Sequence, residues 1–257
     1  MLKIQDVHKT FNPGTINEKK ALNGVNLVLN EGDFVTVIGG NGAGKSTVLN
    51  MIAGVYPVDS GSIMIDDIDV TKLPEHKRAK YLGRVFQDPM NGTAADMNIE
   101  ENLALAARRG KQRFLGWGIT AKEREEYKER LGSLGLGLED RMTSKVGLLS
   151  GGQRQAVTLL MASLRKPKLL LLDEHTAALD PKTADIIMEL TGKIVAEKHL
   201  TTIMVTHNLR FAVEYGNRLL MMHQGHAVMD KKGEEKANTK VDDILDMFNA
   251  ISIECGN

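Results

Sequence analysis

Apolar and polar residues alternate over the first part of the chain. Residues 2–11 and 22–29 alternate in this way, which predicts half-buried antiparallel strands. A turn-rich loop around Asn12-Pro13-Gly14 separates the two. Further short strands are expected at residues 62–66 and 81–86. The chain is therefore expected to begin with an antiparallel β subdomain.

Apolar runs of another kind, without alternation, occur at residues 34–38, 168–172 and 201–206. Such runs are typical of strands that are buried on both faces. Between the last two runs, apolar residues recur at a helical spacing, namely Ile186, Ile187, Leu190 and Ile194. This order of strand, helix and strand favours parallel strands joined by right-handed crossovers.

The chain becomes helix-like and rich in charge between residues 88 and 167. Helices are expected at residues 99–107 and 122–134 and after Ser150. We interpret this segment as a helical subdomain inserted into an α/β core. The expected parts of the chain are residues 1–87 (antiparallel β subdomain and first part of the core), 88–167 (helical subdomain), 168–230 (second half of the core) and 231–257 (C-terminal helix and tail).

A basic run, residues 108–113, lies inside the helical segment. Such a run usually forms the solvated face of a helix, and a surface beside lipid headgroups or a membrane partner is the alternative. An aromatic loop broken by glycines follows at residues 114–118.

Composition narrows the class of protein. The 257 residues include 33 Lys and Arg and 33 Asp and Glu, so no global field attracts nucleic acid, and we expect no nucleic-acid partner. The single cysteine, Cys255, cannot form a disulfide framework and suits a reducing compartment such as the cytosol. The longest apolar runs are about five residues, far short of the roughly 20 that a membrane span needs, and residues 1–6 lack the apolar core of a signal peptide.

A glycine-rich motif directly follows the expected strand at residues 34–38. Gly39-Gly40-Asn41-Gly42-Ala43-Gly44-Lys45-Ser46-Thr47 fits the phosphate-binding pattern G-x-x-x-x-G-K-[ST], and a helix can continue from Ser46. Glycines let successive backbone N–H groups face one anion, while the following helix adds the positive end of its dipole. Lys45 would reach the β- and γ-phosphates, and the Ser46 hydroxyl would bind magnesium. The motif predicts a nucleoside triphosphate site in a P-loop NTPase core.

Two adjacent carboxylates end the expected strand at residues 168–172. Ligands of open α/β sheets bind beyond the carboxyl ends of strands, so Asp173 is a candidate magnesium ligand. Glu174 is then a candidate general base that would polarise the attacking water. Solvated turn residues are the alternative, which the intact phosphate loop disfavours.

A second glycine motif, Leu149-Ser150-Gly151-Gly152-Gln153-Arg154-Gln155, identifies the family. Ser150 can cap a helix, and exposed N–H groups of Gly151 and Gly152 would offer a second anion site. With this motif the whole chain closely resembles the ATP-binding subunits of ABC transporters. The resemblance implies that ATP and magnesium are bound and that the motif contacts the ATP of a second subunit, through Ser150, Gly151, Gly152 and Gln153.

The remaining motifs of that family follow in order. The resemblance implies that Gln87 is the Q-loop glutamine, which contacts magnesium and the reaction centre, and that Asp180 belongs to the D-loop, which couples the dimer. His207 matches the switch histidine and Phe11 the aromatic residue that stacks on adenine. In isolation, Phe11 and His207 would each be interpreted as core residues.

The chain departs from the family pattern after Glu174. The family often has proline there and serine at the start of the D-loop, whereas this chain has His175-Thr176-Ala177-Ala178. Neither change removes a ligand. His175 adds a titratable group next to the base, and a packing or surface role is favoured over tuning of the base.

The resemblance implies an ATPase that drives transport across a membrane. Both half-sites are intact in one chain, so a homodimer would build two complete sites, and a heterodimer with another cassette fits the same pattern. The implied partners are membrane-embedded permease subunits and, for an importer, a substrate-binding protein. The protein would then sit in the cytoplasm, peripheral to the inner face of the cell membrane. Import of an amino acid or other small solute is expected, with permeases of the branched-chain amino-acid type as the narrower assignment.

Two other functions fit the same motifs. One is a soluble ATPase of the same family that serves a cytosolic assembly, and the other is the motor of an exporter. For a transporter, we expect the permease to dock on the Gln87 loop and the adjacent helical insert, including the acidic residues Glu100 and Glu101.

Overall fold

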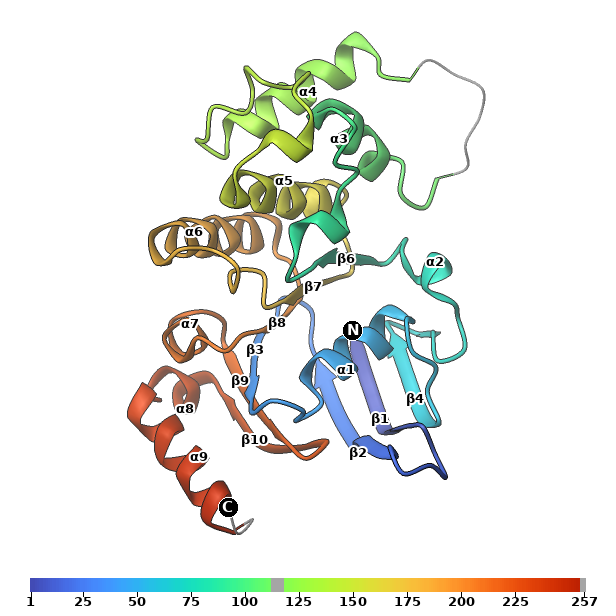
Figure 1. Cartoon of the computed structure of the whole chain (residues 1–257), viewed down its shortest axis with the longest axis vertical. Coiled ribbons are helices and arrows are strands. Elements are labelled where there is room, and N and C mark those ends of the chain that lie inside the picture. The colour runs from blue at the N-terminus through green and yellow to red at the C-terminus, as the bar shows by residue number, and fades with distance from the viewer. Residues whose placement is uncertain (112–117, 255–257) are drawn as a thin grey trace.

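The computed structural model describes residues 1–111 and 118–254 (Figure 1). The aromatic loop expected at residues 114–118 lies outside this part except for Gly118, and so does Cys255. The strands are β1 (Leu2–Phe11), β2 (Lys19–Leu29), β3 (Phe34–Gly39), β4 (Ser60–Ile65), β5 (Ile68–Asp69), β6 (Leu82–Val85), β7 (Leu169–Asp173), β8 (Thr202–Val205), β9 (Arg218–His223) and β10 (His226–Lys232). The helices are α1 (Lys45–Ala53), α2 (Glu75–Arg78), α3 (Ile99–Ala107), α4 (Ala121–Gly132), α5 (Gly151–Leu164), α6 (Pro181–Lys198), α7 (Leu209–Glu214), α8 (Gly233–Ala237) and α9 (Val241–Glu254), with short 3₁₀ turns at Pro89–Gly92 and Val146–Leu148.

The N-terminal strands form an antiparallel sheet in the order β2-β1-β4-β5. Leu2 pairs with Leu29 of β2 on one side and with Ile65 of β4 on the other. These three side chains are buried while neighbouring polar residues are exposed, so one face of the sheet covers the core. The alternation predicted this sheet correctly, although β2 begins at Lys19 rather than at residue 22.

The second sheet has the order β10-β9-β3-β8-β7-β6. Strands β9, β3, β8, β7 and β6 pair in parallel, and β10 is antiparallel to β9. All six residues of β3 are buried, as expected for a strand covered on both faces. The predicted α/β fold with a parallel core and an antiparallel N-terminal sheet is confirmed.

Helix α1 packs between the two sheets. Its Leu49 and Ile52 belong to one buried cluster with Leu2 of β1 and with Val37 and Leu171 of the core strands. Burial of such side chains stabilises each by about 1.5–3 kcal/mol relative to an exposed position. This packing fixes the start of α1, and with it the phosphate loop, against both sheets.

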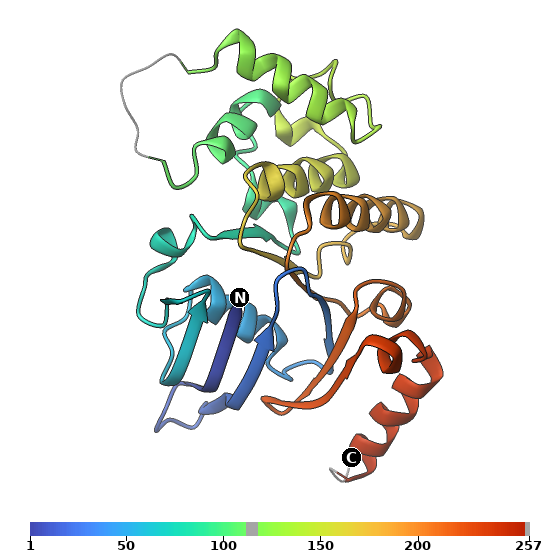
Figure 2. The ribbon, with the colours of Figure 1, turned by 180° about the vertical axis from the view of Figure 1, so that it is seen from behind.

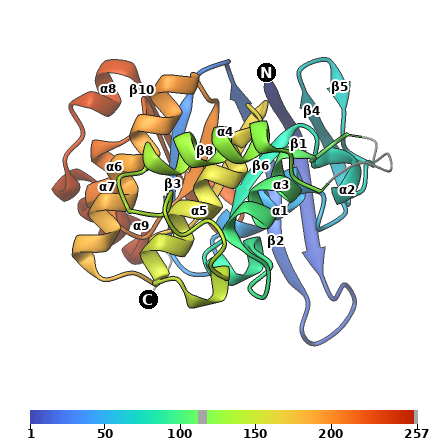
Figure 3. The ribbon, with the colours of Figure 1, turned by 90° about the horizontal axis from the view of Figure 1, so that it is seen from above.

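The other face of the core sheet is covered by α5 and α6. The buried residues of α6 include Ile187, Met188, Leu190 and Ile194, whereas Ile186 is 42% exposed and does not belong to the apolar face that the sequence suggested. Helices α3, α4 and α5 form one end of the molecule and α9 the opposite end (Figure 2). Figure 3 views the molecule from the end that carries α3, α4 and α5.

The basic run at residues 108–113 does not provide a solvated row of charges in its described part. Arg108 donates from Nη1 to the Ala104 carbonyl at 2.9 Å, and Arg109 donates from Nη2 to the Ala162 carbonyl at 3.1 Å. Burial lowers the pKa of Arg109 from its ordinary value. These two arginines hold carbonyl groups of the helical part together, so neither the solvated face nor the lipid-facing alternative describes them.

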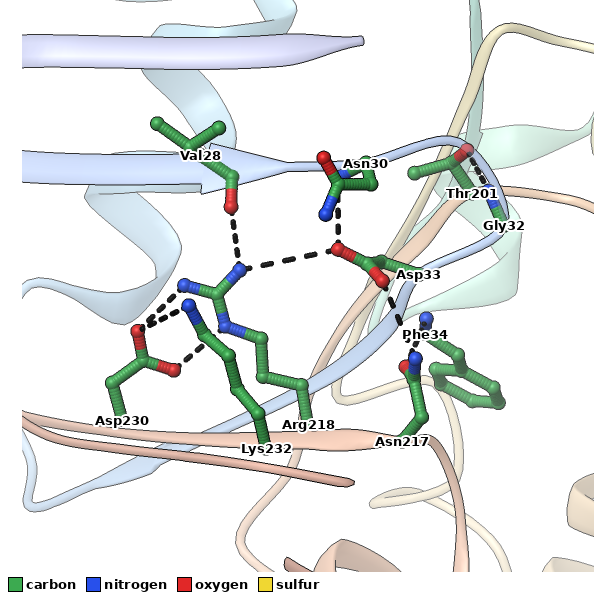
Figure 4. Close-up of polar contacts among 10 residues, drawn as sticks. All are labelled: Val28, Asn30, Gly32, Asp33, Phe34, Thr201, Asn217, Arg218, Asp230 and Lys232. Atoms are coloured by element: carbon green, nitrogen blue, oxygen red, sulfur yellow. Dashed lines mark hydrogen bonds and ion pairs between the residues drawn. The ribbon is translucent and has the colours of Figure 1, made fainter.

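A buried arginine ties the two sheets together. The Arg218 guanidinium donates from Nε and Nη2 to the two carboxylate oxygens of Asp230, both at 2.6 Å, and from Nη1 to the carbonyl of Val28 at the end of β2 (Figure 4). Its Nη1 also lies 4.0 Å from Asp33 in the loop between β2 and β3. Because one side chain joins β2, this loop and the β9–β10 hairpin, the antiparallel sheet is fixed to the core at this corner.

Within residues 1–111 and 118–254, no helix has the length and apolar character to cross a membrane.

Candidate functional site

Four predicted motifs lie at one edge of the core sheet. Strands β6, β7, β8 and β3 are neighbours and run parallel, and Asp173 at the end of β7 pairs with Val205 at the end of β8. The phosphate loop follows β3, Gln87 follows β6, and His207 follows β8. The carboxyl ends of parallel strands form the ligand edge of an open α/β sheet, so the fold itself gathers these residues.

Two glycines of the phosphate loop are required by close backbone approach. A Cβ at Gly39 would lie 2.3 Å from the carbonyl oxygen of Met222 in β9, and one at Gly44 would lie 2.7 Å from that of Ala21 in β2. Both residues have positive φ, 151° and 103° respectively. Larger residues would push the loop away from both sheets.

The first turn of α1 is open for an anion. Gly44 precedes the helix and no side chain caps its N–H groups. The Lys45 ammonium donates to the carbonyls of Gly39 at 2.8 Å and Gly40 at 3.1 Å, which folds its side chain back over the loop. Burial lowers the pKa of Lys45, and nearby Glu174 and Asp173 partly offset that effect. The loop therefore combines N–H donors that no side chain caps with a buried cation, the arrangement that phosphate binding needs.

A hydrogen bond joins Ser46 of the phosphate loop to Asp173 at the end of β7. The Ser46 hydroxyl donates to Oδ1 of Asp173 at 3.1 Å. Burial raises the pKa of Asp173, while the hydrogen bond from Ser46 and the charge of Arg84 act in the opposite direction. A hydroxyl and a carboxylate next to a phosphate loop are the hard oxygen donors that magnesium prefers, so these two residues fit that ion.

Glu174 directs its carboxylate at His207. The Nε2 atom of His207 lies 2.6 Å from Oε1 of Glu174, and the side chains are 45% and 13% exposed, respectively. Glu174 adopts a φ of 47°, in the left-handed region that residues other than glycine rarely occupy. Such strain is common at functional positions, where it aims a side chain that a relaxed backbone would aim elsewhere.

A cleft of about 230 Å³ unites the phosphate loop with these groups. It is lined by Phe11, Lys19, Ala21, Asn41, Gly42, Ala43, Gly44, Lys45, Ser46, Thr47, Glu174 and His207. Phe11 packs edge-on against Tyr56 at a centroid distance of 5.1 Å, which orients its ring at the cleft. Sequence reasoning missed Lys19 and Ala21; the strand register, which brings Lys19 opposite Phe11, would have found the first.

Gln87 and the signature motif lie apart from this cleft. Gln87 is exposed two residues beyond β6 and does not line the cleft. Ser150 precedes α5 and forms a capping box with Gln153, as expected. Gly151 is exposed, but Gly152 is buried, and a Cβ there would lie 2.3 Å from Cγ2 of Thr183 on α6. The exposed N–H groups expected at both glycines therefore stay a prediction for Gly152, whose residue surface is mostly covered.

Two residues after Glu174, His175 and Asp180, form hydrogen bonds with helix α6. Asp180 caps this helix by accepting from the Thr183 N–H at 3.1 Å. His175 is buried, with Nε2 3.1 Å from Oγ1 of Thr191. Because the Thr191 hydroxyl donates to the Ile187 carbonyl, it accepts from His175, which places the proton of the neutral imidazole on Nε2. His175 has the packing role that the sequence favoured, directed away from the cleft.

Comparison with known proteins is consistent with this geometry. Residues 22–177 match the ABC transporter family. A tyrosine transport ATP-binding protein from Clostridioides difficile (strain R20291) is 46% identical over 96% of this chain and 98% of its own length. A dimeric ATP-binding cassette in a post-hydrolysis state with ADP and Pi superposes with a TM-score of 0.76 and 32% identity over 90% of this chain and 98% of its own. The ADP form of another ATP-binding cassette of an ABC transporter superposes with a TM-score of 0.79. It is 27% identical, over 100% of this chain and 99% of its own.

Proposed function

The chain belongs to the ABC transporter family as an ATP-hydrolysing subunit, and from this premise we propose that it drives the import of an amino acid through a partner permease. The observation that carries the proposal is the 46% identity, over nearly the full length of both chains, with a tyrosine transport ATP-binding protein. An aromatic amino acid such as tyrosine is the first substrate to test.

We propose that the cleft residues have the following roles. The phosphate-loop residues Gly39, Asn41, Gly42, Ala43, Gly44, Lys45, Ser46 and Thr47 bind the phosphates, and Phe11 stacks on adenine. Ser46 and Asp173 would hold magnesium, which supplies charge neutralisation at the phosphates when bound. Glu174 accepts the proton of the attacking water, and His207 holds its carboxylate in the cleft at 2.6 Å. Gln87 lies at the same edge of the sheet, and we propose that it moves toward the metal and the water when nucleotide binds.

The complete site would need two copies of the chain. Ser150, Gly151, Gly152 and Gln153 do not line the cleft of their own chain, although the exposed start of α5 offers N–H donors. A similar cassette is dimeric with bound ADP and Pi. We therefore propose that these four residues contact the ATP of a second copy and that the Asp180 segment couples the two sites.

The permease would dock near Gln87. The 3₁₀ turn Pro89–Gly92 begins two residues after Gln87 and exposes Met90, whose side-chain surface is available to a partner. Burial removes Glu100 from this proposed docking surface, whereas Glu101 is partly exposed and stays a proposed part of it. Glu100 is 6% exposed and ion-paired with Arg124 at 2.7 Å, and Glu101 accepts from the Asn98 N–H in a capping box.

Several finer assignments complete the proposal. We place the protein on the inner face of the cell membrane, where permease subunits hold it. A substrate-binding protein would deliver the substrate to the permease. The narrower grouping with branched-chain amino-acid permeases rests only on short sequence phrases, whereas the relative named above favours an aromatic substrate. We also propose that the chain consists of four parts, which end at residues 87, 167, 230 and 257.

The experiment is uptake by the reconstituted transporter. The chain is co-expressed with the permease that co-purifies with it, and uptake of labelled tyrosine, leucine and xylose is measured in vesicles with and without ATP. ATP-dependent uptake of tyrosine above the other two supports the proposal. A chain that co-purifies with a soluble assembly and no permease, or that drives only efflux, would overturn it.

A further inference from the structure

Lys19 begins β2 at the mouth of the nucleotide cleft. In the antiparallel pair of β1 and β2 it lies directly opposite Phe11, so both side chains project from the same face of the ribbon. Both also line the cleft. The Lys19 ammonium lies 3.1 Å from the point where a Cβ of Gly42 would stand, which places it over the phosphate loop.

The charge of Lys19 has no ion-pair partner in the part of the chain that the structure describes. Within residues 1–111 and 118–254 no carboxylate lies within ion-pair distance of its ammonium, whereas Lys9, two positions before Phe11, is paired with Asp59 at 2.7 Å. The other lysine of the cleft, Lys45, is bonded to two loop carbonyls. Lys19 is thus a cation of the cleft without an acceptor among the described residues, and an anion bound on the loop would lie within its reach.

The order of groups along the cleft indicates which part of the nucleotide it meets. Phe11 and Lys45 both line the cleft. In the proposed function, Phe11 stacks on the adenine base of the nucleotide and Lys45 reaches its β- and γ-phosphates. Lys19 is the strand partner of Phe11, and its ammonium stands over Gly42 of the loop that Lys45 ends. Resting on the proposed function, we propose that the Lys19 ammonium binds the α-phosphate of the nucleotide, as a second phosphate-binding cation of this site.

This contact would exist equally with ATP and with ADP, because both carry the α-phosphate. An interaction that is equal in the ground state and the transition state lowers KM without changing kcat. Lys19 would therefore set the affinity for the substrate and for the product ADP together. Glu174 and His207 would continue to set the rate of hydrolysis.

The test compares Lys19→Gln with Lys20→Gln as the matched control. Lys20 is the next residue of β2, equally exposed, and projects from the opposite face of the strand. Affinities for ATP and ADP are measured by displacement of a fluorescent ADP analogue from the purified full chain. We expect Lys19→Gln to weaken both by about tenfold, the lower range for a charge-assisted hydrogen bond in a solvent-open cleft. Lys20→Gln should change neither, and Lys19→Arg should restore most of the affinity.

Each other outcome has a definite meaning. Equal affinities in the Lys19→Gln and Lys20→Gln variants would overturn the inference, and so would a loss that Lys19→Arg does not restore. A loss confined to ATP would exclude the α-phosphate and place the contact at the γ-phosphate. A lower kcat with unchanged KM would show that Lys19 acts on the reaction itself. If the unmodified protein bound neither nucleotide, the proposed function would fail instead, independently of Lys19.

Discussion

The Nε2 atom of His207 lies 2.6 Å from Oε1 of Glu174, although the two residues belong to different strand ends. The contact arises because β7 and β8 are parallel neighbours whose ends are in register at Asp173 and Val205. It restrains a carboxylate that is 13% exposed and faces the phosphate loop. The proposed base, Glu174, and the residue that restrains it, His207, thus follow adjacent strands, and each can be replaced without the other.

Replacing Glu174 by glutamine should separate binding from hydrolysis. The amide keeps the shape of the side chain but cannot accept the proton of water, so the ATPase rate should fall by about 10²- to 10⁴-fold. ATP affinity should stay within about threefold because the phosphate loop is untouched. Phosphate release and nucleotide binding are measured on the same preparation. Near-normal turnover, with contaminating ATPases excluded, would contradict the assignment.

Replacing His207 by alanine should lower the rate through loss of the restraint on Glu174. A hydrogen bond to a charged group contributes about 1.5–3 kcal/mol, which corresponds to roughly 10- to 150-fold in rate if it is needed in the transition state. His76→Ala, at an exposed position on α2, is the control and should leave the rate unchanged. Equal activities of the two variants would show that the 2.6 Å contact has no part in hydrolysis.

Mixing two inactive variants tests the shared site. Lys45→Ala removes the phosphate-loop cation, and Ser150→Arg blocks the start of α5, so each homodimer lacks function at both sites. A heterodimer of the two retains one intact composite site, and ATPase activity should partly recover on mixing. Because Ser150 also caps α5, its loss costs about 1 kcal/mol, and thermal unfolding of the variant must first show a folded protein. Mixed dimers that form but remain inactive would argue against a site completed by the second copy.

His175 should make the stability of the protein depend on pH. Burial lowers its pKa to about 4 from the ordinary 6.5. Between these values the unfolded chain binds a proton that the folded chain excludes, so the free energy of unfolding falls as pH drops from 6.5 to 4, by up to about 3 kcal/mol. The contribution is fully present above pH 6.5.

Denaturant unfolding of His175→Gln measures this effect. Glutamine can still donate to Thr191 but does not titrate, so the decline between pH 6.5 and 4 should be shallower than in the unmodified protein. His76→Gln, a change of an exposed histidine, should retain the full decline. Parallel pH profiles of all three proteins would show that folding does not lower the pKa of His175.

The elements that could be predicted from the sequence are those with a local cause. Alternation marks β1, and uninterrupted apolar residues mark β3, because each pattern reflects burial on one face or on both. The phosphate loop was predicted because its glycines, lysine and serine are contiguous. The meeting of Glu174 with His207 was not predicted, since it depends on strand order, and the resemblance to a family supplied only the role of each residue.

The predictions that failed depend on neighbours that lie far away in the sequence. Arg109 looks like a surface charge until its partner, the Ala162 carbonyl of α5, is known. The close approach of Thr183 on α6 to Gly152 is likewise invisible in the sequence around the helix start. Lys19 has no motif at all, and only the pairing of β1 with β2 brings it to the cleft. Predicting each of these contacts requires knowing how two elements pack against each other, and a single sequence does not contain that information.

The backbone at Glu174 has a consequence for attempts to engineer this protein. With φ at 47°, a glutamate there forgoes about 1 kcal/mol or more that an asparagine, which tolerates this region better, would partly recover. A library selected for heat resistance alone should therefore enrich Glu174→Asn. The selected proteins would unfold at a higher temperature than the parent but would not hydrolyse ATP. Thermal selection on this scaffold should therefore also require ATP turnover, because one of the residues in the strained left-handed region, Glu174, is the proposed general base.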